Sequence, residues 1–301
     1  MKIEWVRVLG VGLFSFLLLG VIFFYQNGKY YDGKLRVVFC DVGQGDAVFI
    51  RTAEGVDILV DGGPDSKVLG CLSSHMPFWD RDLELVFLTH PDSDHSTGLV
   101  DVLKRYKVKT LSLSQDVNMD TLVGTEIERI IKEKKIKMQS LVMGDSFNTG
   151  DGVRIKTFWP GQGSVLGVNS GDDNNLSLVE GVFYKDFSLL LTGDVEAEIL
   201  DQILADFENL DVLKVPHHGS KTAFSDKTFL RVKPGIAVIS AGKNNRYHHP
   251  SGQILSILQE HGIDYKRTDL DGEVEIITDG HNIKYQKSNY SPELKSKEIK
   301  N

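Results

Sequence analysis

The chain has 301 residues, of which 41% are hydrophobic and 25% are charged. It is therefore long enough for one large domain or two small ones, with a sizeable buried core, and its composition is typical of a globular protein. The formal net charge of −8 argues against a protein that attracts nucleic acid through its overall charge. Only two cysteines occur, Cys40 and Cys71, which argues against a disulfide framework or a cysteine metal cluster and predicts two inert thiols.

An uncharged apolar run of 18 residues extends from Val8 to Tyr25, which is long enough for a membrane helix. A cleaved signal peptide is the alternative, but no small-residue cleavage site follows the run. We therefore expect residues 1–25 to form a retained membrane anchor and residues 26–34 to form a polar linker. With so short an N-terminal tail, the N-terminus is expected inside and the remainder outside the cytoplasm.

Beyond the linker, short apolar runs alternate with polar or glycine-rich turns and with amphipathic stretches. In chain order, the predicted strands are 35–39, 47–50, 56–60, 83–88, 109–113, 138–142, 153–158, 176–183, 187–191, 212–215, 236–239, 274–277 and 283–286. The predicted helices are 97–106, 122–134, 196–207, 226–231 and 252–261. Strand-rich halves with added helices predict an α/β fold, a four-layer αββα sandwich over residues 35–286. The lysine-rich tail, 287–301, is expected to be disordered.

Four candidate metal ligands lie within six residues, directly after the predicted strand 83–88: His90, Asp92, Asp94 and His95. A loop can converge all four on one point, and imidazoles with carboxylates suit Zn²⁺, Mn²⁺ or Fe²⁺. A polar surface loop is the alternative interpretation, but the density of ligands disfavours it.

Further candidate ligands follow later predicted strands. Asp194 follows the run 187–191, where a helix cap is the alternative role. His217 and His218 follow 212–215, and strand alternation favours His217 as the ligand with His218 as its support. His249 follows 236–239 through a loop. The three remaining isolated histidines are expected to be ordinary surface residues: His75, His261 and His281.

Two divalent ions that share these ligands would explain their number. Asp194 is the best candidate for a bridging carboxylate, and we expect the reaction to depend on Asp94, Asp194 and His217. Metal binding brings the pKa of bound water toward 7 and so supplies a nucleophile at neutral pH.

The sequence resembles the metallo-β-lactamase superfamily, and more closely the soluble domain of the ComEC competence-channel family. The matching segments, in the family's order, are 39–47, 59–63, 89–95, 174–179, 191–194, 214–220, 240–242 and 249–250. The resemblance implies structural roles for Asp41, Asp46 and Asp61. It implies metal-proximal roles for His90, Asp92, Asp94, His95, Asp194, His217 and His249.

Two departures from the superfamily pattern make the site richer in oxygen. Asp92 replaces a histidine of the usual HxHxDH motif, and Asn174-Asn175 stands where many relatives carry another histidine. These changes suit Mn²⁺ at least as well as Zn²⁺ and argue against a true β-lactamase. His248 stands where the competence relatives more often have glycine, which leaves the choice between His248 and His249 open.

The resemblance implies a phosphodiester substrate, since the corresponding domain of ComEC channels is thought to degrade one strand of incoming DNA. The channel domain itself is not expected in this chain. Basic and polar side chains in the motif loops are candidate phosphate contacts or solvated loop residues: Lys214, Ser220, Lys221, Lys243, Asn245 and Arg246.

One alternative is a cell-surface phosphodiesterase that acts on phosphorylcholine or teichoic-acid decorations. Another is a non-catalytic surface module, which the complete ligand set disfavours. The expected partners are the membrane, a phosphodiester substrate, and competence or wall-polymer proteins.

Overall fold

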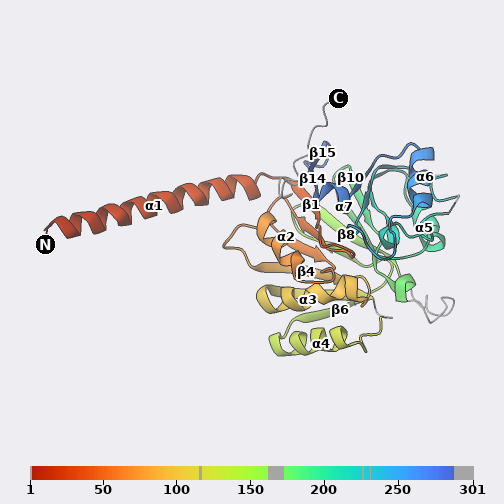
Figure 1. The fold of residues 1–301 in the computed structure, drawn as a ribbon, viewed down its shortest axis with the longest axis horizontal. Coiled ribbons are helices and arrows are strands. Elements are labelled where there is room, and N and C mark those ends of the chain that lie inside the picture. The colour runs from red at the N-terminus through yellow and green to blue at the C-terminus, as the bar shows by residue number, and fades with distance from the viewer. Residues whose placement is uncertain (1, 115–116, 162–172, 226, 231, 288–301) are drawn as a thin grey trace, which may run out of the picture.

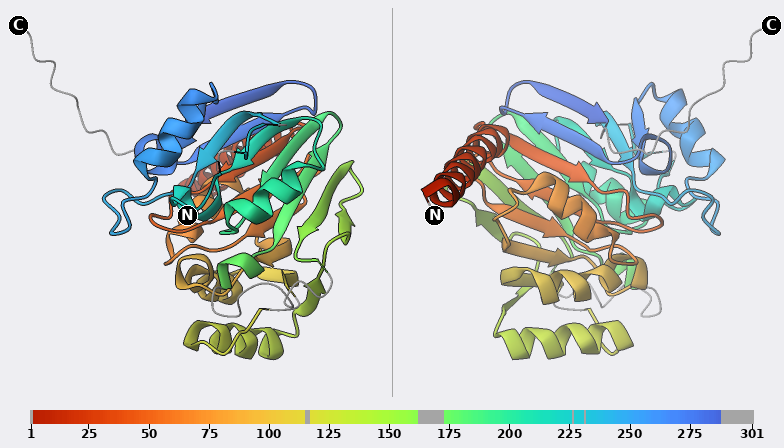
Figure 2. Two further views of the ribbon diagram at one scale, coloured as in Figure 1. Left: turned by 90° about the vertical axis from the view of Figure 1, so that its right-hand side faces the viewer. Right: turned by 60° about the vertical axis from the view of Figure 1, so that its left-hand side comes forward.

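The computed structural model describes residues 2–114, 117–161, 173–225, 227–230 and 232–287. Two β-sheets pack face to face and carry helices on their outer faces (Figures 1 and 2). In these views α3 and α4 lie on one side of the sheets, and α5 and α6 lie on the other. The predicted four-layer αββα sandwich is confirmed.

The first sheet has eight strands in the order β15-β14-β1-β2-β3-β4-β5-β6. Its strands are β1 (Leu35–Phe39), β2 (Val48–Arg51), β3 (Asp57–Val60), β4 (Asp82–Leu88), β5 (Lys107–Ser114), β6 (Lys137–Leu141), β14 (Val274–Thr278) and β15 (Ile283–Lys287). Strands β3 to β6 are parallel, while β1 and β2 pair antiparallel.

The second sheet has seven strands in the order β13-β12-β11-β10-β9-β8-β7. Its strands are β7 (Ser146–Asn148), β8 (Val153–Trp159), β9 (Val179–Tyr184), β10 (Phe187–Leu191), β11 (Leu210–Lys214), β12 (Pro234–Ile239) and β13 (Tyr265–Arg267). Strands β10 to β13 are parallel, so the loops after them leave from the same end of the sheet.

Three apolar layers separate the four structural layers. The central layer joins the two sheets through residues such as Phe39, Ile58 and Leu189. One outer layer lies under α2 (Lys67–His75), α3 (Ser93–Arg105) and α4 (Leu122–Lys134), and the other under α5 (Ala197–Leu204) and α6 (Gly252–Glu260). The short helix α7 spans Thr268–Asp271.

The N-terminal helix α1 runs from Lys2 to Tyr30 and projects away from the sandwich (Figure 1). Its segment Arg7–Tyr30 is long and apolar enough to cross a membrane, with a mean hydropathy of 2.4. The helix thus continues through residues 26–30, which were expected to belong to the linker. Its last residue, Tyr30, is only 6% exposed and packs on the domain. The predicted linker is therefore shortened to the few residues before Leu35.

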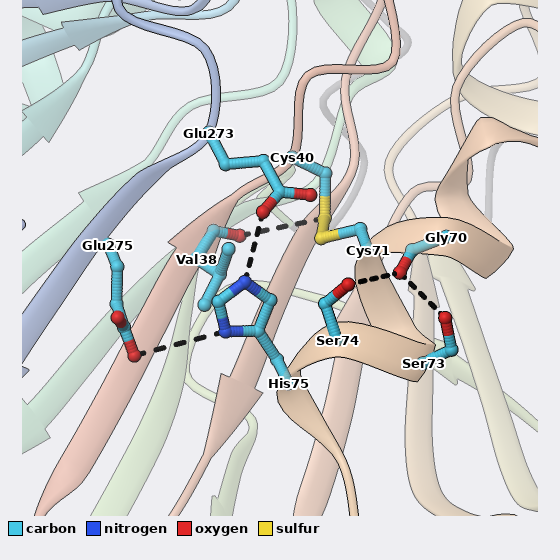
Figure 3. Close-up of a disulfide and its surroundings, with 9 residues drawn as sticks. All are labelled: Val38, Cys40, Gly70, Cys71, Ser73, Ser74, His75, Glu273 and Glu275. Carbon is cyan, nitrogen blue, oxygen red and sulfur yellow. Dashed lines mark hydrogen bonds and ion pairs between the residues drawn. A yellow bond between two sulfur atoms is a disulfide. The ribbon is translucent and has the colours of Figure 1, made fainter. Parts of the chain in front are cut away.

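The prediction of two free thiols is wrong: Cys40 and Cys71 form a disulfide (Figure 3). Cys40 directly follows β1 and Cys71 lies in α2, and sequence patterning offered no sign that these elements are neighbours. His75 lies beside the disulfide with its Nε2 3.0 Å from an oxygen of Glu273 (Figure 3). It is therefore half-buried and ion-paired rather than an ordinary surface histidine.

Most of the predicted elements match the structure within a few residues, but several differ, and the short elements β7, β13 and α7 were not predicted. The described part of the predicted helix 226–231, residues 227–230, forms turns. Helix α2 was not predicted, because its sequence is short and its apolar residues are few. The predicted tail begins inside β15, and residues 288–301 lie outside the described part of the chain.

Candidate metal centre

The predicted ligand loops meet at the carboxyl ends of the parallel strands in both sheets. The segment after β4 carries His90 and Asp92, and Asp94 and His95 lie in the first turn of α3. Asp194 follows β10. The remaining histidine loops follow β11, which pairs with β10, and β12, which pairs with β11 in the second sheet.

Three buried histidines have their Nδ1 atoms engaged by the surrounding protein. His95 Nδ1 lies 2.8 Å from Asp61 Oδ2, and His218 Nδ1 lies 3.0 Å from the carbonyl oxygen of Ser240. His90 Nδ1 lies 3.0 Å from the hydroxyl of Thr89. The acceptors on His95 and His218 place an N–H on Nδ1, so Nε2 is the ring nitrogen that each histidine presents to the cluster.

The Nε2 atoms of His95 and His218 face two carboxylates. Asp194 Oδ2 lies 3.3 Å from Nε2 of both His95 and His218, and Asp94 Oδ2 lies 3.4 Å from His218 Nε2. Within the described residues, the Nε2 atoms of His90, His95 and His218 are buried and make no hydrogen bond. Buried Nε2 atoms without hydrogen bonds, next to carboxylates, fit a divalent cation, and each imidazole already has the outer support that such ligands need.

Asp46 belongs to the same cluster but lies on its outer side. Its ligand oxygen is within 4.8 Å of atoms offered by His95, Asp194 and His218. However, the Asp46 carboxylate contacts the Nδ1 atoms of His95 and His218, at 3.8 and 3.6 Å, rather than their Nε2 atoms. It also forms a buried ion pair with Lys214. Asp46 is thus placed to support the ligands, in keeping with the structural role that the resemblance implies.

Lys214, expected as a phosphate contact, is instead buried within the protein. Its Nζ donates to the carbonyl oxygen of Gly193 at 2.8 Å and lies 3.4 Å from Asp194 Oδ1. Only 1% of its side chain is exposed. The ammonium group therefore orients the Asp194 loop and cannot reach a substrate in this arrangement.

The two histidines after β11 lie in surroundings opposite to those that strand alternation predicts. Both His217 and His218 have left-handed backbone angles, with φ of 47° and 55°, so strand alternation does not extend to them. As a result, His218 enters the buried cluster. The His217 side chain is 27% exposed, and its Nε2 lies 3.9 Å from Asp194 Oδ2.

His249 faces the same centre from the loop after β12, and Asn245 shapes that loop. The Asn245 side chain accepts from the His249 backbone N–H at 3.0 Å and donates to the His249 carbonyl oxygen at 2.6 Å. Because both ends of the amide are engaged, Asn245 holds the loop and is not positioned as the substrate contact that we expected. His248, by contrast, is exposed.

A cavity of about 210 Å³ opens onto the cluster. It is lined by Gln44, Asp92, Asp94, Asp194, His217, His218, Tyr247 and His249. About half of the Asp92 side chain is exposed, and its Oδ2 lies 3.7 Å from His90 Nε2. Lys221 and Arg246 are exposed outside this lining, and the Arg246 guanidinium lies over the ring of Tyr247.

Several supporting residues were not found from the sequence. Ser177 Oγ accepts from the Asp194 backbone N–H at 3.1 Å, and Thr89 donates to Asp61 at 2.7 Å. Asn175, which stands in place of a family histidine, accepts from the Glu196 backbone N–H. These residues flank the motifs, so their position next to a ligand was the available signal. Asp41 is exposed and lies outside the cluster.

The electrostatic environment keeps the carboxylates charged. Burial opposes ionisation of Asp194, but His218, His95 and Lys214 more than offset it and hold the pKa of Asp194 well below its usual range. The pKa of Asp94 is also lowered, because contacts with His218 and His95 outweigh its burial. Burial and the neighbouring histidines lower the pKa of His249 to about 4, so this imidazole is neutral at pH 7. Charged carboxylates and a neutral imidazole are the forms that bind metal.

Comparison with known proteins agrees with this geometry. The family model described as the Beta-lactamase superfamily domain matches residues 57–264. The chain belongs to the metallo-β-lactamase superfamily. It is a metallo-hydrolase-fold protein with a buried His/Asp cluster, and its relatives include a competence protein.

Two of these relatives show how much of each protein is shared. The chain is 32% identical to ComE operon protein 3 of Bacillus subtilis over 81% of its own length and 33% of the relative. It is 28% identical to competence protein ComA of Neisseria gonorrhoeae over 93% of its length and 38% of the relative. The chain therefore spans about a third of the length of these relatives.

Among solved structures, the chain resembles Igni18, a metallo hydrolase from Ignicoccus hospitalis. The TM-score is 0.51 at 14% identity, with coverage of 80% of this chain and 98% of that one. At this identity the similarity supports the fold alone.

Proposed function

We propose that the chain is a membrane-anchored phosphodiesterase that cleaves DNA outside the cytoplasm with a metal-bound hydroxide. The observation that carries the proposal is the convergence of the buried Nε2 atoms of His95 and His218 on Asp94 and Asp194. When metal is bound, it supplies Lewis acidity and a hydroxide nucleophile. Residues His90, Asp92, Asp94, His95, Asp194, His218 and His249 would hold two ions, Zn²⁺ or Mn²⁺.

The surroundings of the centre support a nucleic-acid substrate. Tyr247 is 49% exposed at the cavity and lies parallel to His249, with ring centroids 5.7 Å apart. An exposed aromatic ring is a stacking platform for an unpaired base. The names of the relatives link them to competence, which supports a role of this chain in DNA uptake.

The disulfide supports the proposed location. Disulfides persist in oxidising compartments and are rare in the cytosol, and the Cys40–Cys71 bond lies in the domain that follows α1. A domain held outside the cytoplasm by α1 would meet this condition.

The test uses the full chain in detergent, supplied with Mn²⁺ or Zn²⁺ and three substrates: single-stranded DNA, double-stranded DNA and bis-p-nitrophenyl phosphate. We expect cleavage of the diester and of DNA, abolished in His218→Ala. The matched control is His281→Ala, since His281 and its ion-pair partner Asp186 are both exposed on the surface.

A second function is favoured by the charge of the cavity, since the described residues that line it include three aspartates and neither lysine nor arginine. Such a cavity suits the zwitterionic headgroup of a phosphorylcholine decoration better than a polyanion. Cleavage of the small diester without cleavage of either DNA would reject the nuclease and favour this cell-surface phosphodiesterase. Bound metal with no cleavage of any substrate would indicate a non-catalytic module.

A further inference from the structure

The carboxyl end of α1 is fixed to the domain rather than linked to it flexibly. Tyr30 is buried, and its hydroxyl donates to the carbonyl oxygen of Ser74 at 2.8 Å. Arg51 Nε donates to the carbonyl oxygen of Tyr30 at 3.3 Å. A helix held in this way transmits its own orientation to the domain.

The loop between α2 and β4 contacts α1 one to two turns before this end. Trp79 stacks on Phe23 with ring centroids 5.3 Å apart, and the backbone N–H of Phe78 donates to Gln26 Oε1. Despite these contacts, Phe78 remains 55% exposed and Trp79 remains 38% exposed. Two large aromatic side chains thus lie exposed side by side next to α1.

The contacts of this loop with α1 lie near the residue where the apolar run of the helix ends. The uncharged run from Val8 to Tyr25 has 18 residues, or about 27 Å of helix, close to the ~30 Å hydrocarbon thickness of a bilayer. If this run spans the membrane, the outer boundary lies near Tyr25. Phe23 and Gln26, which contact Trp79 and Phe78, lie at that boundary.

We infer that Phe78 and Trp79 insert into the lipid interface beside α1 and hold the domain in one orientation on the membrane. The inference rests on the proposed membrane anchoring. Aromatic side chains are enriched at this depth because an apolar ring with a polar edge is stable there. The polar contacts of Tyr30 lie farther along the helix, on the aqueous side.

This orientation places the metal centre away from the membrane. Strand β4 begins at Asp82, just after the aromatic loop, and ends at Leu88, just before His90. Its seven residues span roughly 20 Å. Strands β2 and β3 have the same arrangement, with Arg51 and Asp57 at the α1 end and Asp46 and Asp61 at the metal end. The site then receives a polymer from the space outside the membrane, not a headgroup of the bilayer that anchors it.

The test measures the depth of residue 79 in the full chain, reconstituted in phospholipid nanodiscs. Trp5→Phe and Trp159→Phe leave Trp79 as the single tryptophan. Lipids brominated at different acyl positions then quench its emission according to depth. We expect the largest loss of emission with bromine close to the headgroups, and a smaller loss with bromine near the chain ends.

The matched control moves the tryptophan to another exposed apolar position. Leu122 is 94% exposed and begins α4 beyond the metal-side end of β5. In Leu122→Trp, combined with Trp5→Phe, Trp79→Phe and Trp159→Phe, we expect no quenching by any brominated lipid. Activity on the soluble diester shows that both variants are folded.

Two other results would overturn the inference. If the chain stays in the nanodisc but Trp79 is not quenched, or the Leu122→Trp control is quenched equally, anchoring stands and the fixed orientation is rejected. If the chain does not stay in the nanodisc, the anchoring itself fails and the inference fails with it.

Discussion

The histidines at the candidate metal centre differ in which ring nitrogen is hydrogen-bonded to the protein and which one faces the cluster. His95 and His218 present Nε2 to the centre because Asp61 and the Ser240 carbonyl engage Nδ1. His217 lies next to His218 in sequence, but it is more exposed and its Nε2 is 3.9 Å from Asp194. Adjacent histidines therefore have different expected contributions to metal binding.

We expect His218→Ala to weaken metal binding more than about 100-fold, since removal of outer partners alone costs roughly 10–100-fold. His217→Ala is the neighbouring comparison and should weaken binding less than about 10-fold, below that range. Metal content after dialysis against buffered metal measures both, with circular dichroism as the check on folding. Equal losses in the two variants would contradict the assignment.

Glu180 gives a separate prediction, away from the metal. It is fully buried on β9, accepts from Thr157 at 2.9 Å, and burial raises its pKa from 4.5 to about 8. The folded state thus retains a proton that the unfolded state loses, so the free energy of unfolding falls as pH rises from about 4.5 to 8. Glu180→Gln should remove this contribution to the fall and raise the free energy of unfolding at pH 9 by on the order of 5 kcal/mol.

Urea titrations between pH 5 and pH 9 measure the effect of Glu180. Glu198→Gln on the exposed face of α5 is the control and should leave the pH dependence unchanged. A variant at position 180 that retains the wild-type pH dependence would show that this carboxyl is ionised in the folded protein.

Among the elements, β1 and α2 are joined covalently where the first ligand loop begins. Cys40 is bonded to Cys71, and the Cys40 backbone N–H donates to the carbonyl oxygen of Ala47 on the far side of the loop at 2.9 Å. The disulfide therefore holds one end of the loop that carries Asp46. Its effect on stability follows from the length of chain that it closes.

The two cysteines are separated by 31 residues, so reduction should lower the free energy of unfolding by about 3–4 kcal/mol in the loop-entropy model. Urea unfolding with and without a thiol reductant measures the difference. Cys40→Ala/Cys71→Ala should show the lower stability in both conditions. A wild-type chain that does not respond to the reductant would contradict the prediction, provided that thiol titration shows complete reduction.

At the scale of the whole molecule, the proposed membrane contact and the candidate metal centre lie at opposite ends of the same strands. The α1 end carries Tyr30 and the aromatic loop, and the other end carries the ligands from both sheets. Because the candidate ligands come from segments as distant as His90 and His249, only the folded chain brings them together. Metal binding is thus coupled to global stability.

Removal of metal with EDTA should lower the melting temperature. At metal concentrations about 100 times the dissociation constant, binding adds about 3 kcal/mol, which corresponds to on the order of 5–10 °C. Differential scanning calorimetry measures the shift, and readdition of Mn²⁺ or Zn²⁺ should restore it. The same shift in Asp194→Ala would show that the metal binds elsewhere.

The layered fold and the set of loops that meet at the site were predictable from the sequence. Apolar runs such as Leu35–Phe39 and Phe187–Leu191 are local signals, because a buried strand needs apolar side chains wherever it lies. The cluster of candidate ligands from His90 to His95 could likewise be recognised within one short stretch of sequence. The common end of the parallel strands then brought the later loops to the same point.

The atoms that engage one another depend instead on the packing of the folded chain. The left-handed backbone at His217 and His218 brings His218 rather than His217 into the buried cluster, because strand alternation applies only to extended chain. The Asp46–Lys214 pair and the Cys40–Cys71 bond join residues far apart in sequence. Such contacts depend on how whole elements pack, and no periodicity within a single segment encodes them. The docking of Tyr30, which turned an expected linker into a fixed support, has the same physical origin.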